Sequence, residues 1–192
     1  MNDEVVKRNV VLEGVADIMF DRYAGDNNTK LEPWQKLYFD KEEHICLPNL
    51  NIISFLSAHN TNSAPKRLMD ARKFKGVANA CLSFVTITPT FLQFRRNGKP
   101  IKFGKFEKDI DPQSGIYVHR SVARLDKGIP NPKERPVLPL PWTLEFSLLI
   151  WPNKEIQEQQ IINLFETGGR AIGLGTFRGV FGKFIVKAWN KV

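Results

Sequence analysis

A chain of 192 residues with 42% hydrophobic and 11% aromatic residues is long enough to bury the core of one domain, which excludes an intrinsically disordered protein. No apolar run approaches the roughly 20 residues that a membrane helix needs, so we expect no membrane contact. The two cysteines, Cys46 and Cys81, are too few for a disulfide framework and lie outside any C-x-x-C motif, so we expect a cytoplasmic protein in a reducing environment.

The formal net charge of +8 is unevenly distributed along the chain. Residues 65–109 contain 11 Lys and Arg against 3 Asp and Glu, and residues 166–192 contain 5 against 1. Residues 1–64, by contrast, contain 6 against 10. Cations segregated in this way are typical of a face that binds a polyanion, and nucleic acid is the polyanion that we favour.

The first elements are predicted from hydrophobic periodicity. Residues 10–20 alternate between two faces with a period of two, which is typical of a half-buried strand. Residues 36–48 are predicted to form a hairpin whose turn is Asp40–Glu43. A helix is expected over residues 50–59, before the turn-forming residues Asn60–Pro65.

The central part of the chain is basic. Residues 66–75 form either a helix that presents cations or a flexible loop. Residues 82–94 are rich in Thr, Val, Ile and Phe and predict a strand. The pair Asn97-Gly98 predicts a hairpin turn that carries Arg95 and Arg96, with a return strand over residues 100–106.

A proline-rich insertion follows. Residues 107–141 contain six prolines and few candidates for a core, although residues 116–124 favour a strand. Because proline limits ladder pairing, we expect an arm that packs on the domain, on a neighbouring subunit or on the bound strand.

The last elements are the clearest. Residues 142–151 alternate strongly and predict a strand, and residues 153–167 predict a helix with Asn153 as its N-cap and Gly168 after its end. Residues 183–189 predict the final strand. The main elements are therefore strand, helix, strand, strand, helix, strand, which predicts a single α+β domain of the ferredoxin-like βαββαβ class over residues 1–192.

The segment from Glu166 to Phe184 is rich in glycine and carries Arg170, Arg178 and Lys183. Glycine lets another molecule approach the backbone, and exposed N–H groups beside arginine suit phosphate. The segment joins a helix to a strand, so it matches neither the P-loop nor the dinucleotide-binding turn. A connection that uses glycine only for tight turns is the alternative.

We expect no metal, no cofactor and no catalytic centre. His44 and Cys46 are two residues apart on one predicted strand, but the remaining candidate ligands, His59, Cys81 and His119, have no spacing that completes a set. Glu13 and Asp17 share a predicted strand face and are candidate ligands for Mg²⁺, but solvated carboxylates on strands are commoner.

The layout and the glycine-rich segment together resemble the RAMP superfamily, the repeat-associated RNA-binding proteins of CRISPR effector complexes. Ile172-Gly-Leu-Gly-Thr-Phe-Arg-Gly-Val-Phe-Gly-Lys-Phe184 is similar to their Gly-rich loop. Ile45-Cys-Leu-Pro48 before a helix looks like the entry to the first helix of the backbone subunits. Known backbone subunits are commonly longer, and residues 107–141 would be a reduced thumb-like or palm insertion.

The resemblance implies a non-enzymatic subunit that binds single-stranded guide RNA, or that RNA paired with its target, and assembles side by side with copies of itself and other effector subunits. It also implies the cytoplasm of a bacterium or a phage-infected host. The residues that we expect to contact RNA are Arg22, Lys66, Arg67, Arg72, Lys73, Lys75, Arg95, Arg96, His119, Arg120, Arg124, Gly169, Arg170, Gly173, Gly175, Arg178, Gly179 and Lys183.

Two alternatives stay open. A metal-independent RNA endonuclease of the RAMP type would have the same fold, but His44 and His59 do not map onto the histidine site of the processing subunits. A phage or mobile-element assembly protein would use the basic face to contact DNA or another subunit.

Overall fold

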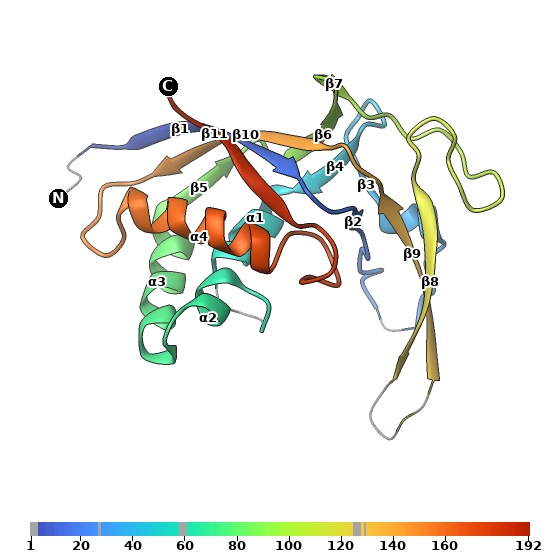
Figure 1. Cartoon of the computed structure of the whole chain (residues 1–192), viewed down its shortest axis with the longest axis horizontal. Coiled ribbons are helices and arrows are strands. Elements are labelled where there is room, and N and C mark those ends of the chain that lie inside the picture. Colours follow the sequence, from blue (N-terminus) through green and yellow to red (C-terminus); the bar gives the residue numbers. More distant parts are fainter. Residues whose placement is uncertain (1–3, 27, 58–60, 125–127, 129) are drawn as a thin grey trace.

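The computed structural model describes residues 4–26, 28–57, 61–124, 128 and 130–192. Its main sheet is antiparallel, with the strand order β11-β1-β10-β6-β4-β3, and β5 also pairs with β10. Helices lie on one face of this sheet, and the other face is open (Figure 1). A second sheet, of order β2-β9-β8, stands at one end of the molecule.

The main sheet confirms the predicted ferredoxin-like class. In this motif β1 is the first strand, β5 together with β6 is the second, β10 is the third and β11 is the fourth. Their order across the sheet is therefore fourth, first, third, second. The bounds are β1 Val6–Gly14, β5 Val85–Thr88, β6 Phe91–Arg96, β10 Thr143–Ile150 and β11 Phe184–Lys191. The helices are α1 Asn49–Leu56, α2 Ala64–Leu68, α3 Ala71–Phe84 and α4 Glu158–Ala171.

Two segments add strands to this motif. The first connection contains β2 Ile18–Met19, a 3-10 turn Pro33–Lys36, β3 Tyr38–Phe39 and β4 Ile45–Pro48. The hairpin of β3 and β4 confirms the one predicted over residues 36–48. The later segment contains β7 Lys99–Pro100, β8 Tyr117–Arg124 and β9 Pro130–Leu138.

The core lies between the main sheet and the helices. Alternate residues of β1 and β10, such as Val10 and Phe146, are buried, as period-two alternation predicts. Phe165 of α4 lies at the centre of an aromatic cluster, with its ring centroid 5.6 Å from Phe55 and 6.3 Å from Phe184. Each such ring adds packing beyond its burial, so this cluster fixes both helices on the sheet.

The predicted strand over residues 10–20 is wrong in one respect, because it is two strands in two sheets. β1 ends at Gly14, where a Cβ atom would lie 2.2 Å from the indole of the buried Trp142. The chain then bends, and Trp142 Nε1 donates to the carbonyl of Ala16 at 3.0 Å. β2 continues beyond the bend and pairs with β9.

The predicted strand over residues 82–94 is also divided. Helix α3 continues to Phe84, and Pro89 and Thr90 separate β5 from β6. The turn at Asn97-Gly98 is confirmed, with positive φ at both residues, but the return strand is only Lys99–Pro100. The basic segment 66–75 belongs to two helices, which settles the choice between helix and loop.

The predicted bounds of the last helix are wrong at both ends. Asn153 Oδ1 accepts hydrogen bonds from the N–H groups of Glu155 and Ile156, which is a local turn, and α4 begins five residues later. Gly168 lies inside α4, because the helix continues to Ala171. A Cβ atom on Gly168 would lie 2.6 Å from the ring of Phe55, so close helix packing explains this glycine.

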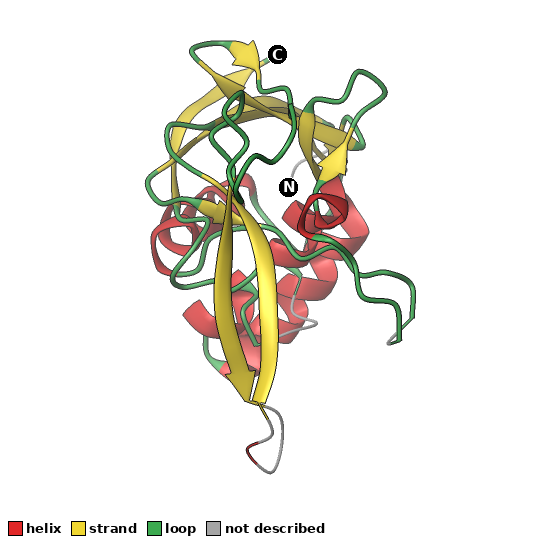
Figure 2. Ribbon diagram, turned by 90° about the vertical axis from the view of Figure 1, so that its right-hand side faces the viewer, coloured by secondary structure: helices red, strands yellow, loops and turns green. Residues whose placement is uncertain are grey.

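The proline-rich insertion forms a long hairpin, with β8 paired to β9 from Tyr117 to Arg124 (Figure 2). Its prolines do not prevent pairing, because Pro130, Pro132 and Pro136 alternate with other residues along β9 and therefore share one edge of the strand. The carbonyl of Pro136 faces away from β8 and accepts from the N–H of Phe20 at 3.0 Å. The missing N–H groups therefore lie on the side that β8 does not use.

The base of the insertion belongs to the domain core, with Ile116, Val137 and Leu138 buried. Asp111 is also buried, and its carboxylate accepts from the N–H groups of Gly104 and Ser114 at 2.9 and 3.2 Å. Hydrogen bonds of this kind stabilise a buried charge and order the chain that enters the hairpin. The few core candidates that the sequence indicated are therefore sufficient to anchor this segment.

Two helical glycines give a matched test of this packing. At Gly76 of α3 an added Cβ atom has nothing within 4 Å, so Gly76→Ala should stabilise the protein by about 1 kcal/mol through helix propensity. Gly168→Ala has the same propensity but would meet Phe55 and Ala64, so it should lower the free energy of unfolding. Urea denaturation measures both, and a stabilising Gly168→Ala would contradict the packing of α1 against α4.

Candidate nucleic-acid interface

The glycine-rich loop, residues 172–183, is closed on itself. The N–H of Leu174 donates to the carbonyl of Gly182 at 2.9 Å, and the N–H of Gly179 donates to the carbonyl of Ile172 at 2.6 Å. Gly173 and Gly175 also have positive φ, which glycine adopts without strain. Many backbone N–H groups of the loop therefore have partners inside the protein.

The loop also packs on the chain that crosses from β1 to β2. The N–H of Thr176 donates to the carbonyl of Met19 at 3.0 Å, and the N–H of Gly182 donates to the carbonyl of Asp17 at 2.7 Å. A Cβ atom on Gly175 would lie 2.5 Å from the carbonyl of Met19. At Gly175 it is therefore the chain that crosses from β1 to β2, and not a ligand, that lies close to the backbone of the loop.

The other glycines of the predicted site fall into two kinds. Gly169 lies inside α4 against Phe184, and Gly173 packs on the backbone of Gly182. At Gly179 an added Cβ atom has nothing within 4 Å, so its backbone is open to an approaching molecule.

Asp17 connects the glycine-rich loop to the insertion. Its Oδ2 accepts from the hydroxyl of Tyr117 at 3.0 Å, and its Oδ1 accepts from the N–H of Leu140 at 3.0 Å. Burial, together with this hydrogen bond, raises the pKa of Tyr117 to about 12. The other predicted carboxylate, Glu13, forms an ion pair with Lys187. In the described part of the chain, no group of three or more His, Cys, Asp or Glu is arranged to hold a metal ion.

His119 of β8 faces the glycine-rich loop. Its ring lies edge to face on Phe181, with centroids 5.6 Å apart. Phe181 in turn lies 6.0 Å from Phe177 of the same loop. The structure therefore brings together two parts of the predicted site that are about 60 residues apart in sequence.

The three cations of the loop region have different surroundings. Arg170 is exposed near the end of α4, and Lys183 is half-buried. Arg178 is turned inwards, where its Nε donates to the carbonyl of Gly175 at 3.2 Å and its Nη2 lies 3.4 Å from Asn51 Oδ1 of α1. Its Nη1 is buried without a hydrogen-bond partner among the described residues, and burial lowers the pKa of the guanidinium.

The cations of α2 and α3 form an exposed ridge on the helical layer. Asp70 caps α3 by accepting from the N–H of Arg72 at 2.8 Å, and its carboxylate also pairs with the Arg72 side chain. Helix α2 packs against α4, because Ala64 lies beside Gly168. This ridge, with Arg170 at the end of α4, is on the helix side of the sheet; its exposed cations are Lys66, Arg67, Arg72, Lys73 and Lys75.

The turn with Arg95 and Arg96 lies elsewhere, at the end of β6 and away from α2 and α3 in Figure 1. Arg96 holds the insertion on the sheet, because its guanidinium donates to three carbonyls, those of Ser114, Pro139 and Pro141, at 2.8, 3.0 and 3.1 Å. Arg95 donates to the carbonyl of Gly98 in its own turn. The predicted cations therefore do not form one continuous surface.

The remaining predicted contacts are on or near the hairpin. Arg22 lies over the ring of Tyr38, 5.9 Å from its centroid. Arg120 forms ion pairs with Asp109 and Glu134 at 2.7 and 3.0 Å. Arg124 ends β8, and its side chain is outside the described part of the structure.

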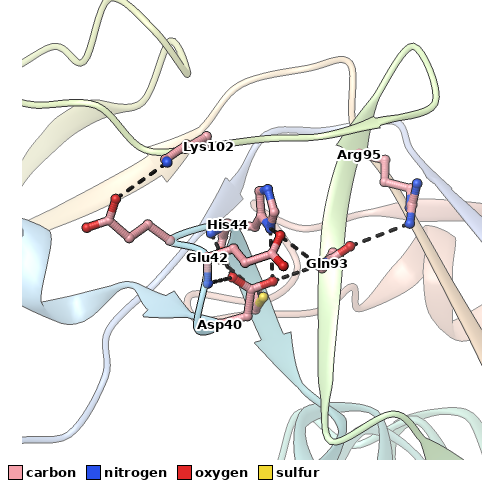
Figure 3. Close-up of polar contacts among 8 residues, drawn as sticks. Asp40, Glu42, His44, Gln93, Arg95 and Lys102 are labelled. Atoms are coloured by element: carbon pink, nitrogen blue, oxygen red, sulfur yellow. Dashed lines mark hydrogen bonds and ion pairs between the residues drawn. The ribbon is translucent and has the colours of Figure 1, made fainter.

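A polar cluster beside the open face of the sheet was missed by the sequence prediction. Asp40 Oδ2 lies 3.0 Å from His44 Nδ1 and accepts from Gln93 Nε2 at 2.6 Å (Figure 3). Next to it is a shallow hollow of about 880 Å³, whose lining includes Arg95 and Glu145. The spacing of an aspartate four residues before a histidine, across a hairpin turn, is the sequence signal for this cluster.

The surroundings of Asp40 and Cys46 shift the pKa values of both side chains. Burial raises the pKa of Asp40, but hydrogen bonds from Gln93 and from the backbone and ring of His44 outweigh it and lower the pKa to about 2. Cys46 is buried beneath, and burial raises the pKa of its thiol to about 12. A raised thiol pKa does not favour Cys46 as a metal ligand beside His44, because a ligating sulfur is a thiolate.

The sequence matches no protein-family model, and no curated protein matches it. Among solved structures, the chain is similar to a chain in the cryo-EM structure of the type III-B Cmr-beta complex bound to cognate target RNA. The identity is 11% and the TM-score is 0.58, over 98% of this chain and 61% of that chain. The similarity supports the ferredoxin-like fold, and the chain spans about three fifths of that neighbour's length. No helix in the described part of the chain is long and apolar enough to span a membrane.

The Asp40 cluster predicts a specific acid sensitivity. Because the folded pKa lies below the ordinary value of 3.8, the stabilisation is complete above about pH 4 and is lost as the pH falls through about 2. Asp40→Asn should lower the free energy of unfolding at pH 7 and reduce its loss between pH 4 and 2. Glu166→Gln, at an exposed position of α4, is the control variant, and equal acid profiles of the two variants would contradict the prediction.

Proposed function

We propose that this chain is a single-stranded RNA-binding subunit of a CRISPR effector complex that holds RNA without cutting it. The observation that carries the proposal is the shared fold, over nearly the whole chain, with a subunit of a complex bound to target RNA. At 11% identity this likeness concerns the fold, so the binding function rests also on the charges and surfaces of this chain.

The distribution of charge supports a polyanionic ligand. The five cations on α2 and α3 are all exposed, and Arg72 also forms an ion pair with Asp70. Like charges that crowd one surface repel each other unless a polyanion lies on them. An RNA strand along this ridge, past Arg170 towards the glycine-rich loop, would contact the cations of both regions.

The junction between loop and hairpin supports a strand rather than a duplex. Phe177, Phe181 and His119 present ring surfaces there. Unpaired bases can stack on such rings, whereas the bases of a closed duplex are already stacked on one another. Because Arg178 is turned inwards, phosphate contacts beside this junction would come from Lys183 of the loop and from the exposed Arg170 near the end of α4. We therefore place the RNA across the loop and β8.

The assembly proposed from the resemblance is also consistent with the hairpin. β8 is an edge strand of the smaller sheet, since the order of that sheet is β2-β9-β8. Residues 109–110 cover the start of this edge, where the N–H of Val118 donates to the carbonyl of Asp109. Edge strands offer unpaired backbone groups that a neighbouring subunit or a bound segment can occupy. We propose that copies of this chain, or other effector subunits, lie side by side along the RNA with this edge at their contact.

An RNA endonuclease is the second candidate, and one observation favours it. Asp40, which lines the open hollow, orients His44, and an imidazole held by a carboxylate is suited to general acid–base chemistry. Incubating the protein with end-labelled RNA in EDTA distinguishes the two functions. The binding function predicts intact RNA, whereas cleavage that His44→Ala abolishes would establish the endonuclease.

Binding is tested by fluorescence anisotropy with a labelled single-stranded RNA across a series of salt concentrations. The proposal predicts that affinity falls as salt rises, with a slope of roughly 0.7 for each phosphate contact, and that duplex DNA competes poorly. Equal affinity for duplex DNA, or assembly without any nucleic acid, would favour the phage or mobile-element alternative.

Charge reversal on the basic ridge tests the site. Arg72→Glu with Lys73→Glu should weaken RNA binding at least tenfold at low salt and reduce the salt slope, with little change in melting temperature because both side chains are exposed. Lys41→Glu with Lys191→Glu is the control, since it changes the net charge equally at exposed positions on other elements. The same loss of affinity in both double variants would show that only net charge matters.

A further inference from the structure

Phe177 has an unusual combination of backbone and exposure. Its φ is 52°, in the left-handed region that side chains with a Cβ atom rarely adopt, and 55% of the residue is exposed. A bulky residue in this conformation lowers the stability of the fold. Because the ring is largely exposed, hydrophobic burial offsets little of that loss. Glycine would suit the backbone better, and the loop uses glycine at four neighbouring positions with positive φ.

The turn around Phe177 holds the ring outward. The N–H of Phe181 donates to the carbonyl of Phe177 at 3.3 Å, which closes a five-residue turn. Arg178 inside this turn points inwards to Gly175 and Asn51, so its side chain braces the turn from below. The ring of Phe177 is therefore presented by a fixed backbone and not by a loose loop.

A second ring supports the first. Phe181 lies 6.0 Å from Phe177 with planes inclined by 33°, and His119 of β8 packs edge to face on Phe181. Val180, between the two phenylalanines, is 58% exposed. Together these side chains form a small aromatic surface, which we call the aromatic tip, at the junction of loop and hairpin.

We propose that Phe177 is a stacking platform for an unpaired nucleobase, backed by Phe181 and His119. This inference rests on the proposed RNA-binding function. In it, the cations contact the phosphates and Phe177 contacts a base. Stacking suits a strand of any sequence, because every base has a π face.

The surroundings favour a base over an apolar protein segment. Residues 166–192 carry 5 Lys and Arg against 1 Asp or Glu, so a polyanion is attracted to this end of the chain. Protein contacts of ordinary size bury many side chains, whereas the aromatic tip is a few rings, with Lys183 in the same loop and the exposed Arg170 in the last turn of the preceding helix. A nucleotide of a single strand matches both the small ring surface, through its base, and the positive charge, through its phosphate.

The test uses the strain at Phe177. Phe177→Gly removes the ring and relieves the positive φ, so the melting temperature should stay the same or rise. Its affinity for single-stranded RNA should fall by about fivefold or more, the loss that corresponds to one stacked base. Phe177→Tyr is the matched control, because it keeps a ring with the same strain and should keep the affinity.

A second probe separates base contacts from phosphate contacts. The wild-type protein should bind a uridine oligomer more tightly than an oligomer of the same length with abasic positions, measured by anisotropy at one salt concentration. Phe177→Gly should bind both oligomers with equal affinity. A variant that still prefers the base-bearing oligomer by the wild-type factor would overturn the stacking role while leaving RNA binding intact.

Two other outcomes are informative. If the wild-type protein binds neither oligomer, the proposed RNA-binding function fails and the platform with it. If Phe177→Gly binds RNA as the wild type does but no longer assembles in light scattering, the ring is a contact between subunits and the stacking role is wrong.

Discussion

The structure depends on a short crossing, Asp17-Ile18-Met19, between the main sheet and the smaller one. Ile18 and Met19 are fully buried, and the backbone carbonyls of Asp17 and Met19 accept hydrogen bonds from the glycine-rich loop. The Asp17 carboxylate meanwhile accepts from Tyr117 and Leu140 of the insertion. One buried segment therefore fixes the loop and the hairpin relative to each other, and a buried polar group left unpaired here would be costly.

This crossing explains why the aromatic tip exists. Because the loop packs on Met19 and the hairpin pairs with β2, their side chains meet at a fixed distance. A rigid base for a binding surface lowers the entropy that is lost when a ligand is bound. Gly175 approaches the carbonyl of Met19, and Gly173 and Gly182 let the loop pack on its own backbone.

Much of the fold follows from the sequence, because it is encoded in local periodicity. The alternation of residues 142–151 and the Asn97-Gly98 turn each require only neighbours in the chain, and both are present in the structure. The break at Gly14 is set by Trp142, which is distant in sequence. Strand β9 was not predicted because it contains several prolines, and the sequence does not show that they lie on the edge that faces away from β8. The inward turn of Arg178 is of the same kind, since its partner Asn51 lies on α1. The Asp40 cluster depends on Gln93 of another strand.

Crosslinking maps the RNA surface most directly. A single-stranded RNA that contains 4-thiouridine is bound to the full chain, irradiated, digested with protease and examined by mass spectrometry for peptides that carry nucleotide. The account predicts crosslinked residues in the glycine-rich loop and in β8, near Phe177, Phe181 and His119, where three rings gather. Crosslinks confined to the open face of the sheet, around Gln93 and Glu145, would contradict it.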